Sequence, residues 1–261
     1  MELELDGRIA IVTGATGPIG LAIARRLLAE GAGVFVCGRT ETKLAAALAG
    51  LGASGRVAGI TADVGDPAAP ARIVAAAVQA FGRLDIVVSN AGAQLRGRLE
   101  ELSAQQVLAQ FATKVIGPWE LARAAAPHLR RQGGGRIVLV IGQAGKVPGR
   151  NVLASAVVNA AQHAFVKSLS DDFGREGILV NAVCVSLIGT PLTAELEVDA
   201  ERWLGRSLEQ QESGWGGAVP LGRPGTVEDA ADAVAFLASA RAGYLCGANI
   251  DVDGGHQRMM F

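Results

Sequence analysis

Tyrosine, cysteine and long apolar runs are all scarce in this chain of 261 residues. It holds one tyrosine, Tyr244, so any mechanism that needs a phenol must use that residue. The cysteines, Cys37, Cys184 and Cys246, are far apart and show no zinc-type spacing, so we expect reduced thiols and no metal site. No apolar run approaches the ~20 residues that a membrane helix needs, so no membrane partner is expected.

An excess of charge of either sign is also missing. The chain has 24 Lys and Arg against 25 Asp and Glu, a formal net charge of −1. Without a basic stripe, nucleic acid is not expected as a partner. The N-terminal residues 1–6 are acidic and lack the basic and apolar regions of a secretory signal, which predicts a cytoplasmic location.

Short runs rich in Val and Ile alternate with longer segments of helical periodicity. These runs show no polar alternation, which is typical of strands covered on both faces, as in a parallel sheet. The pattern predicts one α/β domain over residues 1–261: a doubly wound, Rossmann-type, seven-stranded parallel sheet flanked by helices. Strands are expected at 8–13, 33–37, 56–60, 84–89, 136–141, 178–183 and 249–252, and helices near 18–30, 40–51, 67–81, 103–131, 152–175 and 226–240.

The first predicted strand ends in a glycine-rich turn, TGATGPIG at 13–20, that leads directly into a helix. Such a turn can hold a pyrophosphate on backbone N–H groups at the positive end of the helix. A tight strand-to-helix turn without a ligand is the alternative. Pro18 suits the first helical position but removes one N–H group, whereas Ile19 can still donate.

The second predicted strand is followed by Arg39, where an acidic residue would bind the ribose hydroxyls of NAD. No acid stands there, and Arg39 could instead bind the 2′-phosphate of NADP. The alternative is a solvated surface arginine. Asp63 and Val64 close the third strand, and the run 90–92 (Asn-Ala-Gly) closes the fourth.

Together these motifs resemble the short-chain dehydrogenase/reductase (SDR) family, from about residue 5 to residue 255. The remaining motifs are GRIV at 135–138, VNAV at 180–183, Thr-Pro at 190–191, PLGR at 220–223 and VDGG at 252–255. The resemblance implies an NAD(P)(H)-dependent oxidoreductase acting on a carbonyl or an alcohol. It implies an NADP(H) site at Gly14, Thr16, Pro18, Ile19, Gly20, Arg39, Asp63, Val64, Asn90, Ala91, Gly92, Ile188 and Thr190.

The resemblance also implies a catalytic tetrad of Asn, Ser, Tyr and Lys, and none of the four stands at its expected position. In the family's register these positions hold Lys114, Gly142, Ser155 and Asn159, in that order. An alkyl hydroxyl is far more basic than a phenol, so Ser155 cannot by itself replace the tyrosine as acid and base. The family's Pro-Gly beside the nicotinamide is Val-Ser at 185–186.

Asn and Lys have thus traded places, which leaves two hypotheses. The first is a non-catalytic SDR-fold protein that serves as a subunit beside an active SDR or as a sensor of NADP(H) or another ligand. The second is an atypical enzyme, either a tetrad-independent ketoreductase or a cofactor-independent lyase, isomerase or cyclase. It would use Lys114, Ser155 and Asn159 on an apolar or aromatic substrate. In the plain alternative, Lys114 reaches solvent and Asn159 is a satisfied polar residue.

The remaining expectations concern partners. The segment 187–217 takes the place of the family's substrate lid, and its tryptophans, Trp203 and Trp215, suggest an apolar ligand face or an oligomer contact. The resemblance implies a homodimer, a homotetramer or a mixed oligomer with a catalytically complete SDR, built through the helices near 103–131 and 152–175. We expect His163 and Lys167 to be structural or surface residues and His256 to lie at an interface.

Overall fold

Seven parallel strands form one sheet in the order β3-β2-β1-β4-β5-β6-β7. The computed structural model describes residues 2–52, 55–190 and 219–258. The order confirms the predicted doubly wound Rossmann-type sheet and places its switch point between β1 and β4. The strands are β1 (Ile9–Thr13), β2 (Gly33–Gly38), β3 (Val57–Thr61), β4 (Ile86–Ser89), β5 (Gly135–Gly142), β6 (Ile178–Val185) and β7 (Asn249–Val252).

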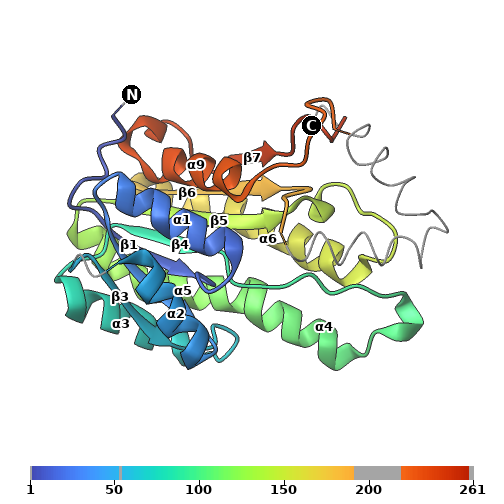
Figure 1. Ribbon diagram of the computed structural model, residues 1–261, viewed down its shortest axis with the longest axis horizontal. Coiled ribbons are helices and arrows are strands. Elements are labelled where there is room, and N and C mark those ends of the chain that lie inside the picture. The colour runs from blue at the N-terminus through green and yellow to red at the C-terminus, as the bar shows by residue number, and fades with distance from the viewer. Residues whose placement is uncertain (1, 53–54, 191–218, 259–261) are drawn as a thin grey trace.

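Helices cover both faces of the sheet (Figure 1). On one face α1 and α9 lie side by side over a core that includes Ile23, Leu27 and Val234. On the other face α3, α5 and α6 pack over a second apolar core, which includes Ile73 and Leu129. The helices are α1 (Pro18–Ala29), α2 (Glu41–Leu51), α3 (Ala69–Phe81), α4 (Ala104–Phe111), α5 (Gly117–Arg131), α6 (Leu153–Phe173) and α9 (Val227–Ala238).

The continuous apolar runs became strands because both faces of the sheet are covered. Every residue of β1, β2 and β4 is buried, as the lack of polar alternation predicted. The edge strand β3 is only partly buried, since it has one neighbour in the sheet. Strand and helix ends lie within two residues of the predicted ends.

The helix expected over 103–131 is interrupted, which the periodicity did not predict. It consists of α4, a π-helical turn (Ala112–Ile116) and α5. Pro118 explains the interruption, because it has no N–H group to donate to the carbonyl of Lys114 and its ring would crowd that carbonyl. The π-helical turn carries Lys114 itself, and such single turns often occur at functional sites.

Most of the predicted lid lies outside the described residues. Of the segment 187–217 the structure describes 187–190, where Ile188 pairs with Gly225 in an isolated bridge.

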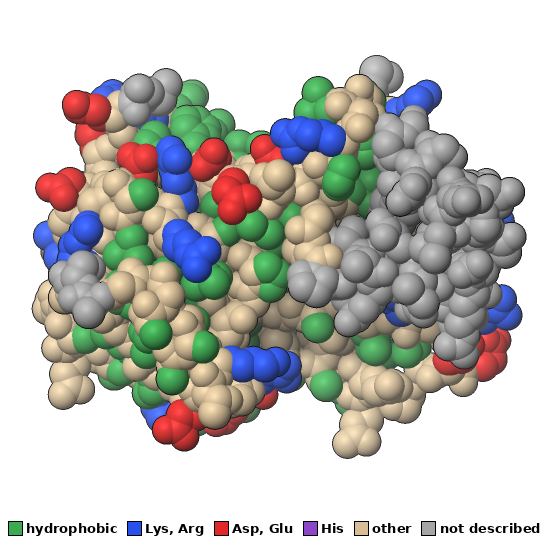
Figure 2. Space-filling view, viewed as in Figure 1, with side chains coloured by type: hydrophobic (Ala, Val, Ile, Leu, Met, Phe, Trp, Pro, Cys, Tyr) green, Lys and Arg blue, Asp and Glu red, His purple; other side chains and the backbone are tan. Residues whose placement is uncertain are grey.

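In the parts of the chain that are described, no helix is long and apolar enough to cross a membrane. Figure 2 shows Lys and Arg side chains interspersed with Asp and Glu over the described part of the visible face.

Candidate cofactor and ligand site

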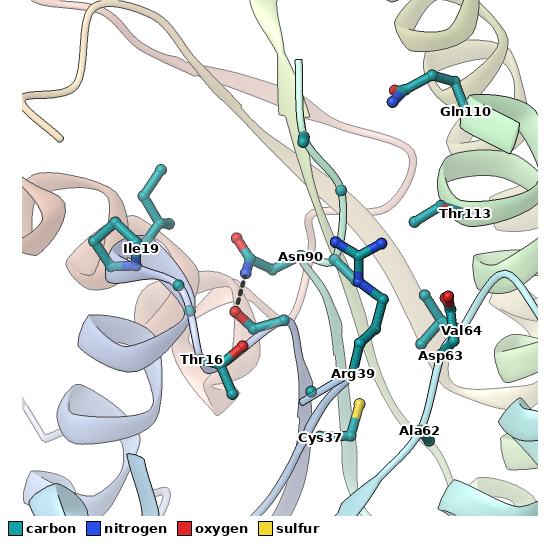
Figure 3. A pocket seen from close by; sticks show the side chains of 18 of the residues that line it. Thr16, Ile19, Cys37, Arg39, Ala62, Asp63, Val64, Asn90, Gln110 and Thr113 are labelled. Carbon is teal, nitrogen blue, oxygen red and sulfur yellow. Dashed lines mark hydrogen bonds between the residues drawn. The ribbon is translucent and has the colours of Figure 1, made fainter. Parts of the chain in front are cut away.

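A cavity of about 420 Å³ opens at the carboxyl ends of β1, β2, β3 and β4, next to the switch point of the sheet. Figure 3 shows its walls, which come from the turn after β1, the ends of β2 and β3, the loop after β4 and the far helix α4. Twelve of the thirteen predicted cofactor residues line it, all except Ile188. The lining residues are Gly14, Thr16, Gly17, Pro18, Ile19, Gly20, Cys37, Gly38, Arg39, Ala62, Asp63, Val64, Asn90, Ala91, Gly92, Ala93, Gln110, Thr113 and Thr190.

The turn after β1 offers two backbone donors to this cavity. Gly17 closes the turn by donating to Gly14 O, and Leu21 makes the first bond of α1, to Gly17 O. The amides of Ile19 and Gly20 therefore lie in the first turn of α1, where a helix has no partner for them. Pro18 opens the helix and removes one donor, as predicted.

Two glycines of this turn are required by close packing. A Cβ on Gly20 would lie 2.5 Å from Gly14 O and 2.6 Å from Asn90 Nδ2. Gly14 has a φ of +67°, and a Cβ there would lie 2.8 Å from Ala91 Cα. The glycine pattern thus brings α1 against the loop after β4, so that the positive end of the helix faces the cavity.

Asn90 holds the turn in place. Its Nδ2 donates to Thr13 O at 3.1 Å and to Gly14 O at 3.4 Å. The backbone amides of Asn90 and Ala91 both donate to Thr13 Oγ1, at 3.0 and 3.1 Å. The amide group that the sequence assigned to the cofactor is therefore engaged with the backbone of the turn, and Asn90 is a positioning residue.

Arg39 is exposed and follows β2 directly, and its guanidinium extends into the cavity between Thr16 and Asp63 (Figure 3). Asp63 Oδ1 accepts from the amide of Gly65 at 2.9 Å, which fixes the carboxylate at the cavity edge. The guanidinium is thus exposed and forms part of the cavity wall.

Sequence reasoning missed Gln110 and Thr113, which line the far wall of this cavity from α4 and the π-helical turn. Gln110 precedes Thr113 by three residues and Lys114 by four, a spacing that puts the three side chains on one face of a helix. That polar spacing, just before the Gly-Pro at 117–118, was the signal available in the sequence.

A second cavity, of about 410 Å³, adjoins the first and shares with it Ile19, Asn90, Ala91 and Gly92 among other residues. Lys114 and Asn159 both line it, and Lys114 Nζ donates to Asn159 Oδ1 at 3.3 Å. The stem of Lys114 lies on Gly92, where a Cβ would come within 2.6 Å of Lys114 Cε.

Lys114 is therefore directed into the cavity. Burial lowers the pKa of its ammonium to about 8. Its ammonium ends at Asn159 Oδ1 in a partly buried position, and Asn159 is a hydrogen-bonded polar residue, as the plain alternative expected.

Gly142 lies directly beside Asn159. A Cβ at Gly142 would lie 2.7 Å from Asn159 Nδ2, so any side chain at 142 requires Asn159 to move. Residues 142 and 159 are therefore coupled: the lack of a side chain at one makes room for the amide of the other.

Ser155 does not share the cavity, contrary to the expectation that it works with Lys114. It is 1% exposed. Its Oγ donates to Leu95 O at 2.9 Å and accepts from Leu95 N, also at 2.9 Å. The backbone of one residue thus takes the proton and one lone pair of the hydroxyl, so Ser155 anchors the loop after β4.

The second cavity also contains His256, which the sequence suggested as an interface residue. Its Nδ1 lies 3.3 Å from Ser186 Oγ. Gln143, another residue not predicted for the site, donates from Nε2 to Asp253 Oδ2 at 2.8 Å. These residues follow β5, β6 and β7, whose carboxyl ends meet at the same edge of the sheet, and this was the signal for them.

The remaining candidates lie elsewhere. Tyr244 is fully exposed and lines neither cavity, so no phenol reaches the described walls. His163 Nδ1 lies 2.8 Å from Asn249 Oδ1, a structural contact, and Lys167 is exposed, as expected. Across residues 2–52, 55–190 and 219–258, no cluster of three or more acidic, His or Cys side chains could hold a metal ion.

Known proteins resemble this chain over nearly its whole length. A family model described as enoyl-(acyl carrier protein) reductase matches residues 14–257. The short-chain reductase protein NovJ of Streptomyces niveus is 36% identical over 253 residues, which cover 95% of this chain and 93% of that protein. The 3-oxoacyl-(acyl-carrier-protein) reductase FabG of Escherichia coli K12 is 32% identical and covers 97% of this chain, with 98% of its own length aligned.

A solved structure agrees with these relatives. The L-sorbose reductase from Gluconobacter frateurii, determined in complex with NADPH and L-sorbose, superposes with a TM-score of 0.92 at 28% identity. The superposition covers 100% of both chains. Sequence, sheet order and the position of the glycine-rich turn therefore lead to the same conclusion: this chain belongs to the short-chain dehydrogenase/reductase family.

Proposed function

We propose that this protein binds NADP(H) in the first cavity but does not carry out the tyrosine-dependent carbonyl chemistry of its family. In this proposal it acts as a non-catalytic subunit beside a catalytically complete SDR, or as a sensor of NADP(H) or a second ligand. The observation that carries the proposal is the position of Ser155. Its hydroxyl is hydrogen-bonded to the N–H and the C=O of Leu95 and lines neither cavity.

The residues of the first cavity fit a dinucleotide. The amides of Ile19 and Gly20 at the start of α1 suit a pyrophosphate, and Arg39 at the end of β2 suits a 2′-phosphate. A Cβ added to Gly17 would have a single neighbour, Gly14 O at 3.5 Å, so the turn leaves room for an approaching phosphate. Bound NADPH would supply a hydride, and the L-sorbose reductase relative was solved with this cofactor.

The residues at the four tetrad positions do not supply the family's proton chemistry. Gly142 has no side chain, Ser155 is buried against Leu95, and Asn159 is a neutral amide. A carbonyl that accepts a hydride also needs a proton at its oxygen, and a positioned group of suitable pKa normally supplies it. Lys114 is the one ionisable group among these four residues.

The proposal is tested by separating binding from turnover. The purified protein should bind NADPH in calorimetry and should oxidise none of it above background with a panel of β-keto esters and aldehydes. The matched control is the relative from Escherichia coli, the 3-oxoacyl-(acyl-carrier-protein) reductase FabG, assayed with the same panel. Steady NADPH oxidation by the isolated chain would refute the non-catalytic assignment, and the absence of NADPH binding up to millimolar would refute the cofactor assignment.

One observation favours the second candidate function, an atypical enzyme. Lys114 faces the second cavity, and burial brings its pKa to about 8, close enough to neutral for it to donate or accept a proton. If turnover is found with any substrate, the Lys114→Met variant should lose it, whereas Lys43→Met, a substitution at an exposed lysine of α2, should keep it. Activity that survives Lys114→Met would exclude this candidate.

A further inference from the structure

The second cavity combines apolar walls with basic side chains. Its apolar residues include Val140 and Val185 of β5 and β6, Val147 and Val152 of the loop between β5 and α6, and Ile188 after β6. The ionisable residues among its described walls are Arg96, Lys114 and His256, and the described walls include no Asp or Glu.

Lys114 has a polar partner but no described counter-ion. Its contact is the neutral oxygen Asn159 Oδ1 at 3.3 Å, which accepts one of the three N–H bonds of an ammonium. None of the salt bridges among the described residues includes Lys114. A partly buried cation that is hydrogen-bonded but not neutralised is stabilised when an anion binds beside it.

The carboxylate behind this wall is already engaged. Asp253 accepts from Gln143 Nε2 at 2.8 Å, from the amide of Gly255 at 2.9 Å and from the amide of Gln257 at 2.8 Å. It therefore fixes the wall of the cavity and does not act as the counter-ion of Lys114.

We propose that the second cavity binds a small organic anion, with its carboxylate at the Lys114 ammonium and an apolar body against the valines of β5 and β6. The geometry that supports this is the stem of Lys114 laid across Gly92, with its ammonium in the cavity wall at Asn159 Oδ1. The inference rests on the proposed function in one respect, namely that the space beside the dinucleotide turn takes a second small molecule.

The test compares two probes of nearly the same shape, naphthalene-2-carboxylate and naphthalene-2-carboxamide, by calorimetry in the full-length protein with and without NADPH. We expect the carboxylate to bind at least about tenfold more tightly, equivalent to about 1.4 kcal/mol. The preference should fall to about twofold or less in Lys114→Met, persist in Lys114→Arg and be unchanged in Lys43→Met. Retained binding of NADPH or of the amide shows that the Lys114→Met variant is folded.

Each other outcome counts against the inference. Equal binding of both probes, binding of neither, or a charge preference that survives Lys114→Met would overturn it. Competition between the carboxylate and NADPH would assign Lys114 to the cofactor and would also overturn it. Failure of NADPH to bind would refute only the cofactor proposal, because the comparison of the two probes in the cofactor-free protein still decides the inference.

Discussion

Lys114 and Asn159 meet in the second cavity through a hydrogen bond of 3.3 Å, although they are 45 residues apart in the chain. The π-helical turn before α5 supplies the lysine, and the first part of α6 supplies the amide. Because Asn159 also lies directly over Gly142, the position of the Asn159 amide depends both on Lys114 and on the lack of a side chain at 142.

The first prediction concerns this arrangement. Gly142→Ser should destabilise the protein by roughly 1–3 kcal/mol, because the new Cβ lies 2.7 Å from Asn159 Nδ2 and forces the amide to move. In the double variant Gly142→Ser/Asn159→Ala the clash is removed, so urea unfolding should show a favourable coupling energy of about 0.5–3 kcal/mol. Strictly additive effects of the two substitutions would show that residues 142 and 159 are not coupled.

The second prediction concerns pH. Burial holds the pKa of Lys114 at about 8 in the folded protein, below the ordinary value of 10.5. Between these values the unfolded chain binds the additional proton, so folded stability rises with pH across this window. Relative to Lys114→Met, the wild-type protein should therefore gain free energy of unfolding between pH 8 and pH 10, measured in urea at each pH. A constant difference between the two proteins over this range would contradict the prediction.

The third prediction concerns Ser155. Ser155→Ala leaves the partly buried N–H and C=O of Leu95 without their partner and should cost roughly 1–3 kcal/mol of stability. The affinity for NADPH should stay within about twofold of the wild type, because the hydroxyl lines neither cavity. Ser168→Ala, at an exposed position on the same helix, is the matched control and should change neither quantity. A large loss of NADPH affinity with unchanged stability would return Ser155 to the site.

The fourth prediction concerns cofactor choice. Arg39→Ala removes a charge-assisted contact worth roughly 1.5–3 kcal/mol, so the Kd for NADPH should rise about 10- to 100-fold. The Kd for NADH should change little, since NADH has no 2′-phosphate. Arg72→Ala, at an exposed arginine paired with Asp66 away from the cavity, provides the control. An equal loss for both cofactors would show that Arg39 does not distinguish them.

The sequence by itself determined the sheet and the position of the glycine-rich turn. Continuous runs of Val and Ile can be buried only with helices on both faces, and a glycine-rich turn between a strand and a helix has few other conformations. These signals are local, and the structure confirms the parallel doubly wound sheet, the strand positions and the turn that begins α1.

Only the tertiary structure decided what the unusual residues do. Sequence spacing placed Ser155 and Lys114 in one site. In the structure the serine hydroxyl is hydrogen-bonded to Leu95 and does not line the cavity. Pro118 interrupts the helix that carries the lysine. Gln110 lines the first cavity, and Gln143 and His256 line the second, from three segments far apart in the chain. The direction of a side chain depends on contacts between segments far apart in the chain, and short-range patterns of hydrophobicity and turn residues do not determine it.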